Sequence, residues 1–100
     1  MDKYTVRLNL KAYKDIDEIF SYIALEKLSP ENAKAQTERI WKALKSLEIF
    51  PEAHQDRVEG YYAGKGYKQL LIDNYLAIFK INKDKKIVQI ITVQYQARNL

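Results

Sequence analysis

Residues 67–95, YKQLLIDNYLAIFKINKDKKIVQIITVQY, decide the fold of this chain because they read as three consecutive strands. The apolar segments 67–73, 75–82 and 86–95 are separated by Asp73-Asn74 and by the polar turn NKDK, and short turns of this kind join antiparallel neighbours. The last segment is dense in β-branched residues, which is typical of a central strand covered on both faces. The sequence therefore predicts an antiparallel β meander in its second half.

The residues before the meander predict one strand and then a helix. Residues 4–10, YTVRLNL, place apolar side chains at every second position, the period of a half-buried strand. Residues 11–27 place apolar side chains at helical spacing instead, at Ala12, Ile16, Ile19, Phe20 and Ile23. On this helix Asp15, Asp17 and Glu18 are expected to form a solvated face.

A second helix follows after a clear start signal. Ser29 is suited to the N-cap and Pro30 to the first helical position, and Pro51 lies beyond the expected end near residue 47. Its apolar face is predicted to contain Ala33, Ile40, Trp41, Leu44 and Leu47. We therefore expect an α+β fold in a single domain, residues 1–100: an N-terminal strand, an antiparallel two-helix hairpin and an antiparallel β meander forming one sheet, with the helices packed on one face.

The composition narrows the possible chemistry. Hydrophobic residues make up 47% and charged residues 30% of the 100 positions, as in a globular protein, and no signal peptide or membrane-spanning segment is recognisable, so a cytoplasmic location is expected. Cysteine is absent and His54 is the single histidine, which excludes disulfides and Cys/His zinc sites. No acidic pair has convincing metal-binding spacing, so neither a metal nor a cofactor is expected. The net charge of +4 favours polyanionic partners.

The stretch RVEGYYAGKGYK, residues 57–68, holds every glycine of the chain. It does not fit a phosphate-binding Walker A loop, because Glu59 stands where a glycine is needed and Gly66 where a Ser or Thr is needed. One interpretation is a connector whose glycines allow positive φ. The other is a surface for single-stranded RNA, because the stretch interleaves phosphate-neutralising cations with stacking rings. Its cations are Arg57, Lys65 and Lys68, and its rings are Tyr61, Tyr62 and Tyr67.

The last predicted strand ends in TVQYQARNL, so Tyr95 and Arg98 stand at the end of a rigid element that could aim them at a substrate. The alternative is that both residues are structural, with Tyr95 as a buried aromatic and Arg98 as a charged residue that keeps the end of the chain soluble. Together with LEIFPEA, YKQLLIDNYLAIFKI and VQIITVQYQARN, the order of elements resembles the RelE/ParE superfamily of toxins from type II toxin–antitoxin systems. Six positions carry this resemblance: Lys68, Asn74, Tyr75, Phe79, Tyr95 and Arg98.

The resemblance implies a growth-arresting toxin that forms a hetero-oligomer with a cognate antitoxin. Members similar to RelE cleave mRNA on the ribosome without a metal, whereas members similar to ParE poison DNA gyrase. An arginine commonly follows the tyrosine equivalent to Tyr75 in the ribonuclease branch, but this chain has Leu76 there, as ParE-like sequences do. We interpret the sequence as that of a RelE-like endoribonuclease, with the ribosome and mRNA as its partners. The alternatives are a non-enzymatic gyrase inhibitor and a binding module that only receives its antitoxin.

For the ribonuclease we hypothesise a metal-free mechanism in which the substrate 2′-hydroxyl is the nucleophile. Arg98 and Lys68 would hold the phosphate, Tyr95 would move the proton, and Lys65 with Arg57 would stabilise the developing charge. Because a free tyrosine titrates near pH ~10, this role for Tyr95 requires nearby cations. The bases would stack on Tyr61, Tyr62 or Tyr67, and the glycine-containing stretch would border the same groove as Tyr95. His54 is expected to have a surface or capping role.

Overall fold

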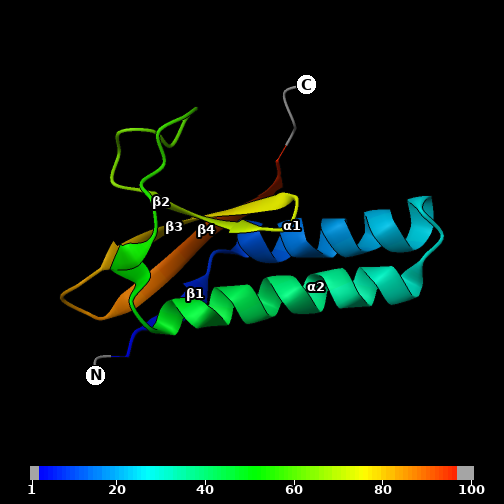
Figure 1. Cartoon of the computed structure of the whole chain (residues 1–100), viewed down its shortest axis with the longest axis horizontal. Coiled ribbons are helices and arrows are strands. Elements are labelled where there is room, and N and C mark those ends of the chain that lie inside the picture. The colour runs from blue at the N-terminus through cyan, green and yellow to red at the C-terminus, as the bar shows by residue number, and fades with distance from the viewer. Residues whose placement is uncertain (1–2, 97–100) are drawn as a thin grey trace.

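A computed structural model describes residues 3–96, and its elements follow the order predicted from the sequence. The strands are β1 (Thr5–Leu8), β2 (Lys68–Ile72), β3 (Tyr75–Asn82) and β4 (Ile87–Tyr95), and the helices are α1 (Leu10–Ser21) and α2 (Pro30–Lys45). The π-helical turn η1 (Tyr22–Glu26) continues α1, and two short 3-10 turns, η2 (Ser46–Glu48) and η3 (Pro51–Ala53), follow α2. The helices form the expected antiparallel hairpin, which reaches beyond one end of the sheet (Figure 1).

The four strands form one mixed sheet in the order β1-β4-β3-β2. The predicted meander of β2, β3 and β4 is antiparallel, whereas β1 runs parallel to β4, with Val6 opposite Val88. β1 is shorter than predicted because Asn9 takes the N-cap position of α1 and its carbonyl accepts the N–H groups of Ala12 and Tyr13. The α+β fold is therefore confirmed. β4 is an inner strand, as predicted, but it is not covered on both faces, because Ile87, Gln89 and Ile91 on the face opposite the helices are only half-buried.

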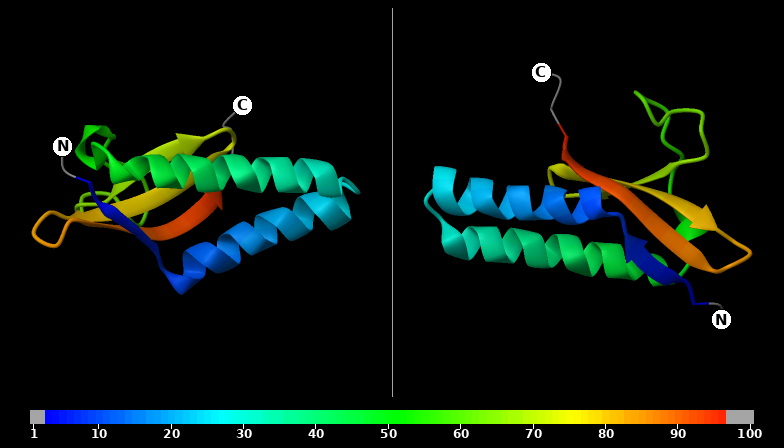
Figure 2. Two further views of the ribbon diagram at one scale, coloured as in Figure 1. Left: turned by 90° about the horizontal axis from the view of Figure 1, so that it is seen from below. Right: turned by 180° about the vertical axis from the view of Figure 1, so that it is seen from behind.

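Both helices pack on one face of the sheet, where the core lies (Figure 2). Buried residues of this core are Ala12 and Ile16 of α1, Ile40 and Leu44 of α2, and Ala77, Phe79, Val88, Ile90 and Val93 of the sheet. Phe20 and Trp41, both predicted on the buried helix faces, are 40% and 39% exposed. Each directly follows a residue of the inward stripe, and one helical step of about 100° turns its side chain away from the sheet.

A β-bulge in β4 decides which of its side chains face the helices. Phe79 pairs with Ile90, whereas the residue before Phe79 pairs with Thr92, so Ile91 has no partner on β3. Strict alternation from Ile90 would turn Tyr95 away from the helices. The extra residue reverses this direction, so Tyr95 lies on the helix side of the sheet, opposite Tyr75.

Residues 54–67 connect η3 to β2 as a loop that stands on the side of the sheet opposite the helices (Figure 1). The Arg57 N–H donates to the Tyr67 carbonyl at 2.8 Å and closes the base of this loop. Gly60 and Gly64, at φ +74° and +69°, adopt the left-handed conformation that glycine tolerates best. The glycines therefore shape a turn-rich loop, as the connector interpretation predicted.

Candidate functional site

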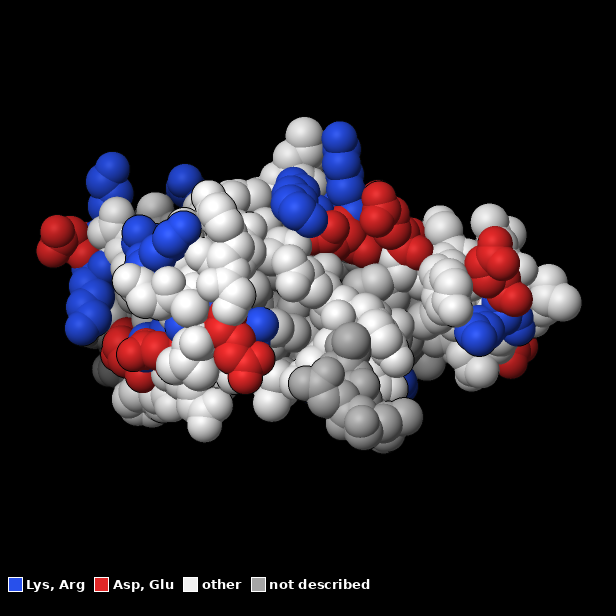
Figure 3. All heavy atoms as spheres, turned by 90° about the horizontal axis from the view of Figure 1, so that it is seen from above, with Lys and Arg blue, Asp and Glu red and all other residues white. Residues whose placement is uncertain are grey.

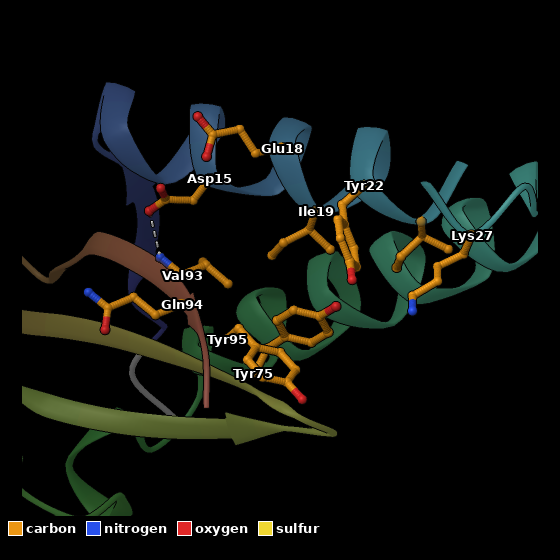
Figure 4. Close-up of a pocket in the computed structure, with 10 residues that line it drawn as sticks. Asp15, Glu18, Ile19, Tyr22, Lys27, Tyr75, Val93, Gln94 and Tyr95 are labelled. Atoms are coloured by element: carbon orange, nitrogen blue, oxygen red, sulfur yellow. Dashed lines mark hydrogen bonds between the residues drawn. The ribbon is translucent and has the colours of Figure 1, made fainter. Parts of the chain in front are cut away.

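A cleft of about 700 Å³ lies between α1 with its η1 extension and the adjoining ends of β3 and β4 (Figure 4). We call it the helix-face cleft. It is lined by Asp15, Glu18, Ile19, Tyr22, Ile23, Lys27, Tyr75, Val93, Gln94 and Tyr95. Apolar side chains and three phenol rings dominate this lining, while its ionised groups are two carboxylates and one ammonium. Such a mixture suits the aromatic and apolar side chains of a binding partner.

Two tyrosines form the floor of the helix-face cleft. Tyr75 and Tyr95 are paired across β3 and β4, and their ring centroids lie 5.7 Å apart in an edge-to-face arrangement. Tyr75 is buried, whereas Tyr95 is 65% exposed. Burial raises the pKa of the Tyr75 phenol, and the neighbouring Tyr95, Tyr22 and Asp73 add to this rise. Tyr75 therefore acts as a neutral packing group and presents Tyr95 toward solvent.

Asp15 anchors α1 to the edge of β4 beside this cleft. Its carboxylate accepts the Val93 N–H at 3.0 Å and the Thr92 hydroxyl, and it forms an ion pair with Lys11 at 3.0 Å. β1 has ended at this level of the sheet, so the carboxylate takes the place of a strand partner. The prediction that Asp15 faces solvent is wrong, since only 13% of its side chain is exposed. Asp17, in contrast, is exposed as expected.

The turn η1 supplies the opposite wall of the cleft. Its first residue, Tyr22, points into the cleft, and the Lys27 N–H donates to the Tyr22 carbonyl at 3.3 Å (Figure 4). The Lys27 ammonium lies 5.6 Å from the centre of the Tyr22 ring, a cation–π contact. Single π-helical turns in an otherwise α-helical segment are frequent at functional sites, because they rotate side chains out of helical register.

A second group of aromatic and basic side chains lies on the loop side of the sheet. Tyr61, Tyr62, Lys65, Tyr67 and Lys80 form it, and we call it the loop cluster. The ring centroids of Tyr61 and Tyr62, and of Tyr62 and Tyr67, are both 5.0 Å apart. The Lys65 ammonium lies 3.8 Å from the centre of the Tyr61 ring, and the Lys80 ammonium lies 5.1 Å from that of Tyr67. The predicted stacking tyrosines are therefore already engaged with each other and with cations.

Lys68 holds the loop against the start of β2. Its ammonium donates to the His54 carbonyl at 2.9 Å and to the Asp56 carboxylate at 2.8 Å. The His54 ring contacts Phe79 edge-to-face, with centroids 6.0 Å apart, and His54 is the C-cap residue of η3. These contacts give Lys68 a structural task in addition to any role toward a phosphate.

Arg57 is also engaged in the fold. Its guanidinium donates to the Gln69 side chain at 2.9 Å. Its Nε is buried and has no hydrogen-bond partner among residues 3–96. Arg57 is therefore packed against the sheet at the base of the loop, with part of its donor capacity unused.

The structure does not bring the predicted catalytic residues into one group. Tyr95 lies in the helix-face cleft, and none of residues 57–68 lines that cleft. Lys65 belongs to the loop cluster on the other side of the sheet. Lys68 pairs with Phe79, four residues along β3 from the partner of Tyr95, a separation of about 13 Å. Arg98 lies outside the described residues.

Sequence reasoning missed Lys80 of the loop cluster and every residue that lines the helix-face cleft except Tyr95, including the two other tyrosines. Tyr22 and Tyr75 line the cleft, and Lys80 joins the loop cluster. The position of Lys80 could have been predicted from the sequence. It is the one charged residue within the apolar segment 75–82, and the alternation of side chains in a strand places it on one face of the sheet. Nothing local to Tyr22 indicates that a π-helical turn will direct it toward a strand far away in the sequence.

No group of three or more His, Cys, Asp or Glu side chains among residues 3–96 is arranged to hold a metal ion. Within the same residues, no helix has the length and apolar character needed to cross a membrane.

Comparisons with known proteins show which protein family this chain matches. A family model described as ParE toxin of type II toxin-antitoxin system, parDE, matches residues 6–100. A sequence search among curated proteins gives no match.

Solved structures share the fold at low sequence identity. A chain of the chromosomal ParDE system from P. aeruginosa superimposes with a TM-score of 0.77 at 21% identity, covering 97% of this chain and 100% of that chain. A chain of the RelBE2 toxin–antitoxin complex from Mycobacterium tuberculosis gives 0.63 at 22% identity, covering 98% and 97%. A chain of the archaeal RelE–RelB complex from Pyrococcus horikoshii gives 0.65 at 14%, covering 97% and 99%. The chain therefore belongs to the ParE family of toxins of type II toxin–antitoxin systems, which confirms its predicted membership of the RelE/ParE superfamily.

Proposed function

We propose that this toxin arrests growth by binding DNA gyrase through the helix-face cleft, without cutting RNA, and that a cognate antitoxin silences it. This proposal takes the gyrase-inhibitor alternative in preference to the ribonuclease. The match to the ParE family model supports it. The observation that carries it is the charge around Tyr95.

Metal-free RNA cleavage needs cations around the phosphate, both to bind it and to stabilise the charge of the transition state. Among the described residues that line the helix-face cleft, Asp15 and Glu18 are acidic and Lys27 alone is basic. Carboxylates repel a phosphate, so this cleft is poorly suited to hold a scissile phosphate beside Tyr95. An exposed phenol ring above an apolar floor is instead well suited to anchor a protein partner.

The residue after Tyr75 supports the same proposal. Leu76 stands where ribonuclease-like relatives commonly carry an arginine, and its side chain is 3% exposed. It points to the face of the sheet opposite Tyr75, away from the helix-face cleft. An arginine substituted at this position would have to leave the packed interior before it could approach any phosphate.

A ribonuclease remains the second candidate because of one observation. Tyr95 is 65% exposed at the end of a rigid central strand, where a substrate can reach it, and Arg98 follows three positions later in the sequence. Proton transfer and phosphate binding need at least a group such as the Tyr95 phenol and a cation such as an arginine guanidinium.

Two variants of Tyr95 separate the candidates. The toxin, Tyr95→Phe and Tyr95→Ala are each induced without antitoxin, and labelled precursor incorporation and mRNA integrity are followed. A gyrase inhibitor should stop DNA synthesis and induce the SOS response, keep its toxicity in Tyr95→Phe, and lose most of it in Tyr95→Ala. Fragmented mRNA, early loss of protein synthesis and an inactive Tyr95→Phe would establish the ribonuclease instead. The absence of growth arrest by the parent chain would leave only a binding module.

Purified components test the target directly. The toxin should inhibit the supercoiling activity of gyrase at concentrations where Tyr95→Ala does not. Lys34→Gln, an exposed change on α2, serves as the control and should inhibit like the parent. Unimpaired supercoiling at saturating toxin would contradict the proposed target.

The antitoxin is expected to be a small acidic protein encoded beside this toxin. Solved relatives with this fold include toxin–antitoxin complexes of the RelBE and ParDE types. An acidic chain complements the net charge of +4. Co-expression of the neighbouring reading frame should restore growth and give a complex that co-purifies with the toxin.

A further inference from the structure

We infer that the face of the sheet opposite the helices carries a binding surface for single-stranded nucleic acid, separate from the helix-face cleft. The surface joins the loop cluster to a hollow on the β3–β4 hairpin. This inference does not rest on the proposed function, because it uses none of the residues that line the helix-face cleft.

The hollow follows from the strand register. In β3 and β4 before the bulge, Lys80 pairs with Gln89, and Ile90 and Phe79 face the helices, so Lys80 and Gln89 face the loop side. A concave region of about 560 Å³ results on that side. Its lining includes Lys80, Lys83, Lys85, Ile87, Gln89 and Ile91. We call the hollow and the loop cluster together the loop-face surface.

Lys80 connects the two parts. Its ammonium lies 5.1 Å from the centre of the Tyr67 ring, and a Cβ added to Gly66 would lie 3.9 Å from its Cε. From Tyr67 the chain of edge-to-face rings continues through Tyr62 to Tyr61, which is 75% exposed. The three rings therefore form one row with a lysine at each end, Lys80 beside Tyr67 and Lys65 beside Tyr61.

The charges of this surface favour an anion. Lys80, Lys83 and Lys85 are exposed around the hollow, against a single carboxylate in its lining, Asp84. Within residues 3–96 no carboxylate forms an ion pair with these lysines or with Lys65. Figure 3, which views the loop side, shows that Asp and Glu side chains also lie at the end of the molecule that carries this hairpin, beside its Lys and Arg side chains. The charge of the unpaired lysines is therefore available to a ligand.

The arrangement matches the chemistry of a single strand. Unpaired bases stack on exposed aromatic rings while the backbone phosphates follow a row of cations, and this mode tolerates many sequences. A duplex hides its base faces and would meet only the lysines. An acidic peptide would use the lysines but gain little from the rings. We therefore assign the rings to bases and the lysines to phosphates.

The test measures binding of labelled oligonucleotides of about 12 nucleotides to the purified full chain, a length that covers the site sizes of comparable surfaces. Oligothymidine, oligouridine, a duplex of the same length and an oligoglutamate peptide are compared by fluorescence anisotropy. Either single strand should bind at least about tenfold more tightly than the duplex or the peptide. Comparison of the two single strands identifies whether DNA or RNA is preferred.

Matched variants locate the surface. The triple change Lys80→Gln, Lys83→Gln and Lys85→Gln should weaken binding at least tenfold and should flatten the salt dependence, because each lost phosphate contact removes about 0.7 from its logarithmic slope. The control triple, Lys34→Gln, Lys42→Gln and Lys45→Gln on exposed positions of α2, removes the same charge and should bind within about twofold of the parent. Tyr61→Leu should weaken single-strand binding about tenfold and leave duplex binding unchanged.

All variants change exposed side chains, and unchanged circular dichroism verifies that they fold. Equal losses in the two lysine triples, tighter binding of the duplex or the peptide, or the absence of oligonucleotide binding by the parent chain would each overturn the inference. Because Tyr95→Ala leaves the loop side intact, it should bind oligonucleotides like the parent. Loss of binding in that variant would show that the surface is not separate from the helix-face cleft.

Discussion

On the helix side of the sheet, tyrosine rings lie in a cleft beside carboxylates, whereas on the loop side they contact one another and lysines. The same residue type thus serves two surfaces of different character. Tyr75 is buried and its pKa is raised by that burial, while Tyr61 is 75% exposed and contacts the Lys65 ammonium. A phenol therefore takes its role from its neighbours, so a count of tyrosines and lysines along the chain does not locate a site.

Both faces of the sheet depend on the same buried core, so the largest effect is expected from a change there. Phe79 is fully buried in the central part of β3. Phe79→Ala should destabilise the protein by about 3–5 kcal/mol, since it removes a core ring and leaves a cavity. Total stabilities of about 5–15 kcal/mol leave little margin for such a loss. Urea unfolding followed by the fluorescence of Trp41 measures it, and a loss below about 1 kcal/mol would contradict the assigned core.

The second change should affect the helix side alone. Asp15→Ala leaves the buried Thr92 hydroxyl and the Val93 N–H without their acceptor, so a loss of about 1–3 kcal/mol is expected in the same urea experiment. Asp17→Ala, an exposed change on the same helix, is the control and should cost far less. Similar losses in the two variants would show that Asp15 is not a specific anchor. Oligonucleotide binding should survive in both.

The third change should affect the loop side alone. Gly64 has φ +69° and no atom within 4 Å of an added Cβ, so Gly64→Ala introduces backbone strain of about 1–2 kcal/mol without a clash. The Ala63 amide, which donates to the Gly60 carbonyl at 3.2 Å, should then exchange its hydrogen about tenfold faster. Val58→Ala, an exposed position of the same loop, is the control. Unchanged exchange in Gly64→Ala would refute the assigned turn.

The smallest effect concerns the turn between β2 and β3, where Asp73 holds α2. Hydrogen bonds from Arg39, at 2.9 Å, and then from Gln36 lower the pKa of the Asp73 carboxyl. The contribution to stability is therefore present above the unfolded-state pKa of 3.8 and is lost as the pH falls through the lower folded-state value. Because the ion pair is exposed, we expect it to contribute less than about 1 kcal/mol to the free energy of unfolding.

The variant Asp73→Asn tests the direction of this pH dependence. At neutral pH the variant should be slightly less stable than the parent, and the difference should vanish in strong acid. Arg39→Gln should reproduce the effect, because it removes the first cause of the lowered pKa. If the difference in stability between variant and parent grew as the pH fell, the pair of Asp73 and Arg39 would not be the source of the stabilisation.

The predicted elements follow from local patterns. Alternation and turn residues in 67–95 indicated three strands, and the structure has them at residues 68–72, 75–82 and 87–95. The order of elements and the helical hairpin were predicted for the same reason, since each depends on short-range periodicity and spacing. The superfamily was predicted from a resemblance to known toxins instead. The exposure of Phe20 and Trp41 was missed, because a residue beside the buried stripe can fall on either side of its boundary.

Which residues contact one another depends on the tertiary structure. β1 joins β4 across some 80 positions, and Asp15 caps an edge that exists only because β1 ends early. The bulge at Ile91 moved Tyr95 from the loop side to the helix side, away from Lys65, since one extra residue reverses every following side chain of a strand. The sequence by itself thus determined the elements through their periods. The sites depended on register, pairing and one irregular residue, which no local period encodes.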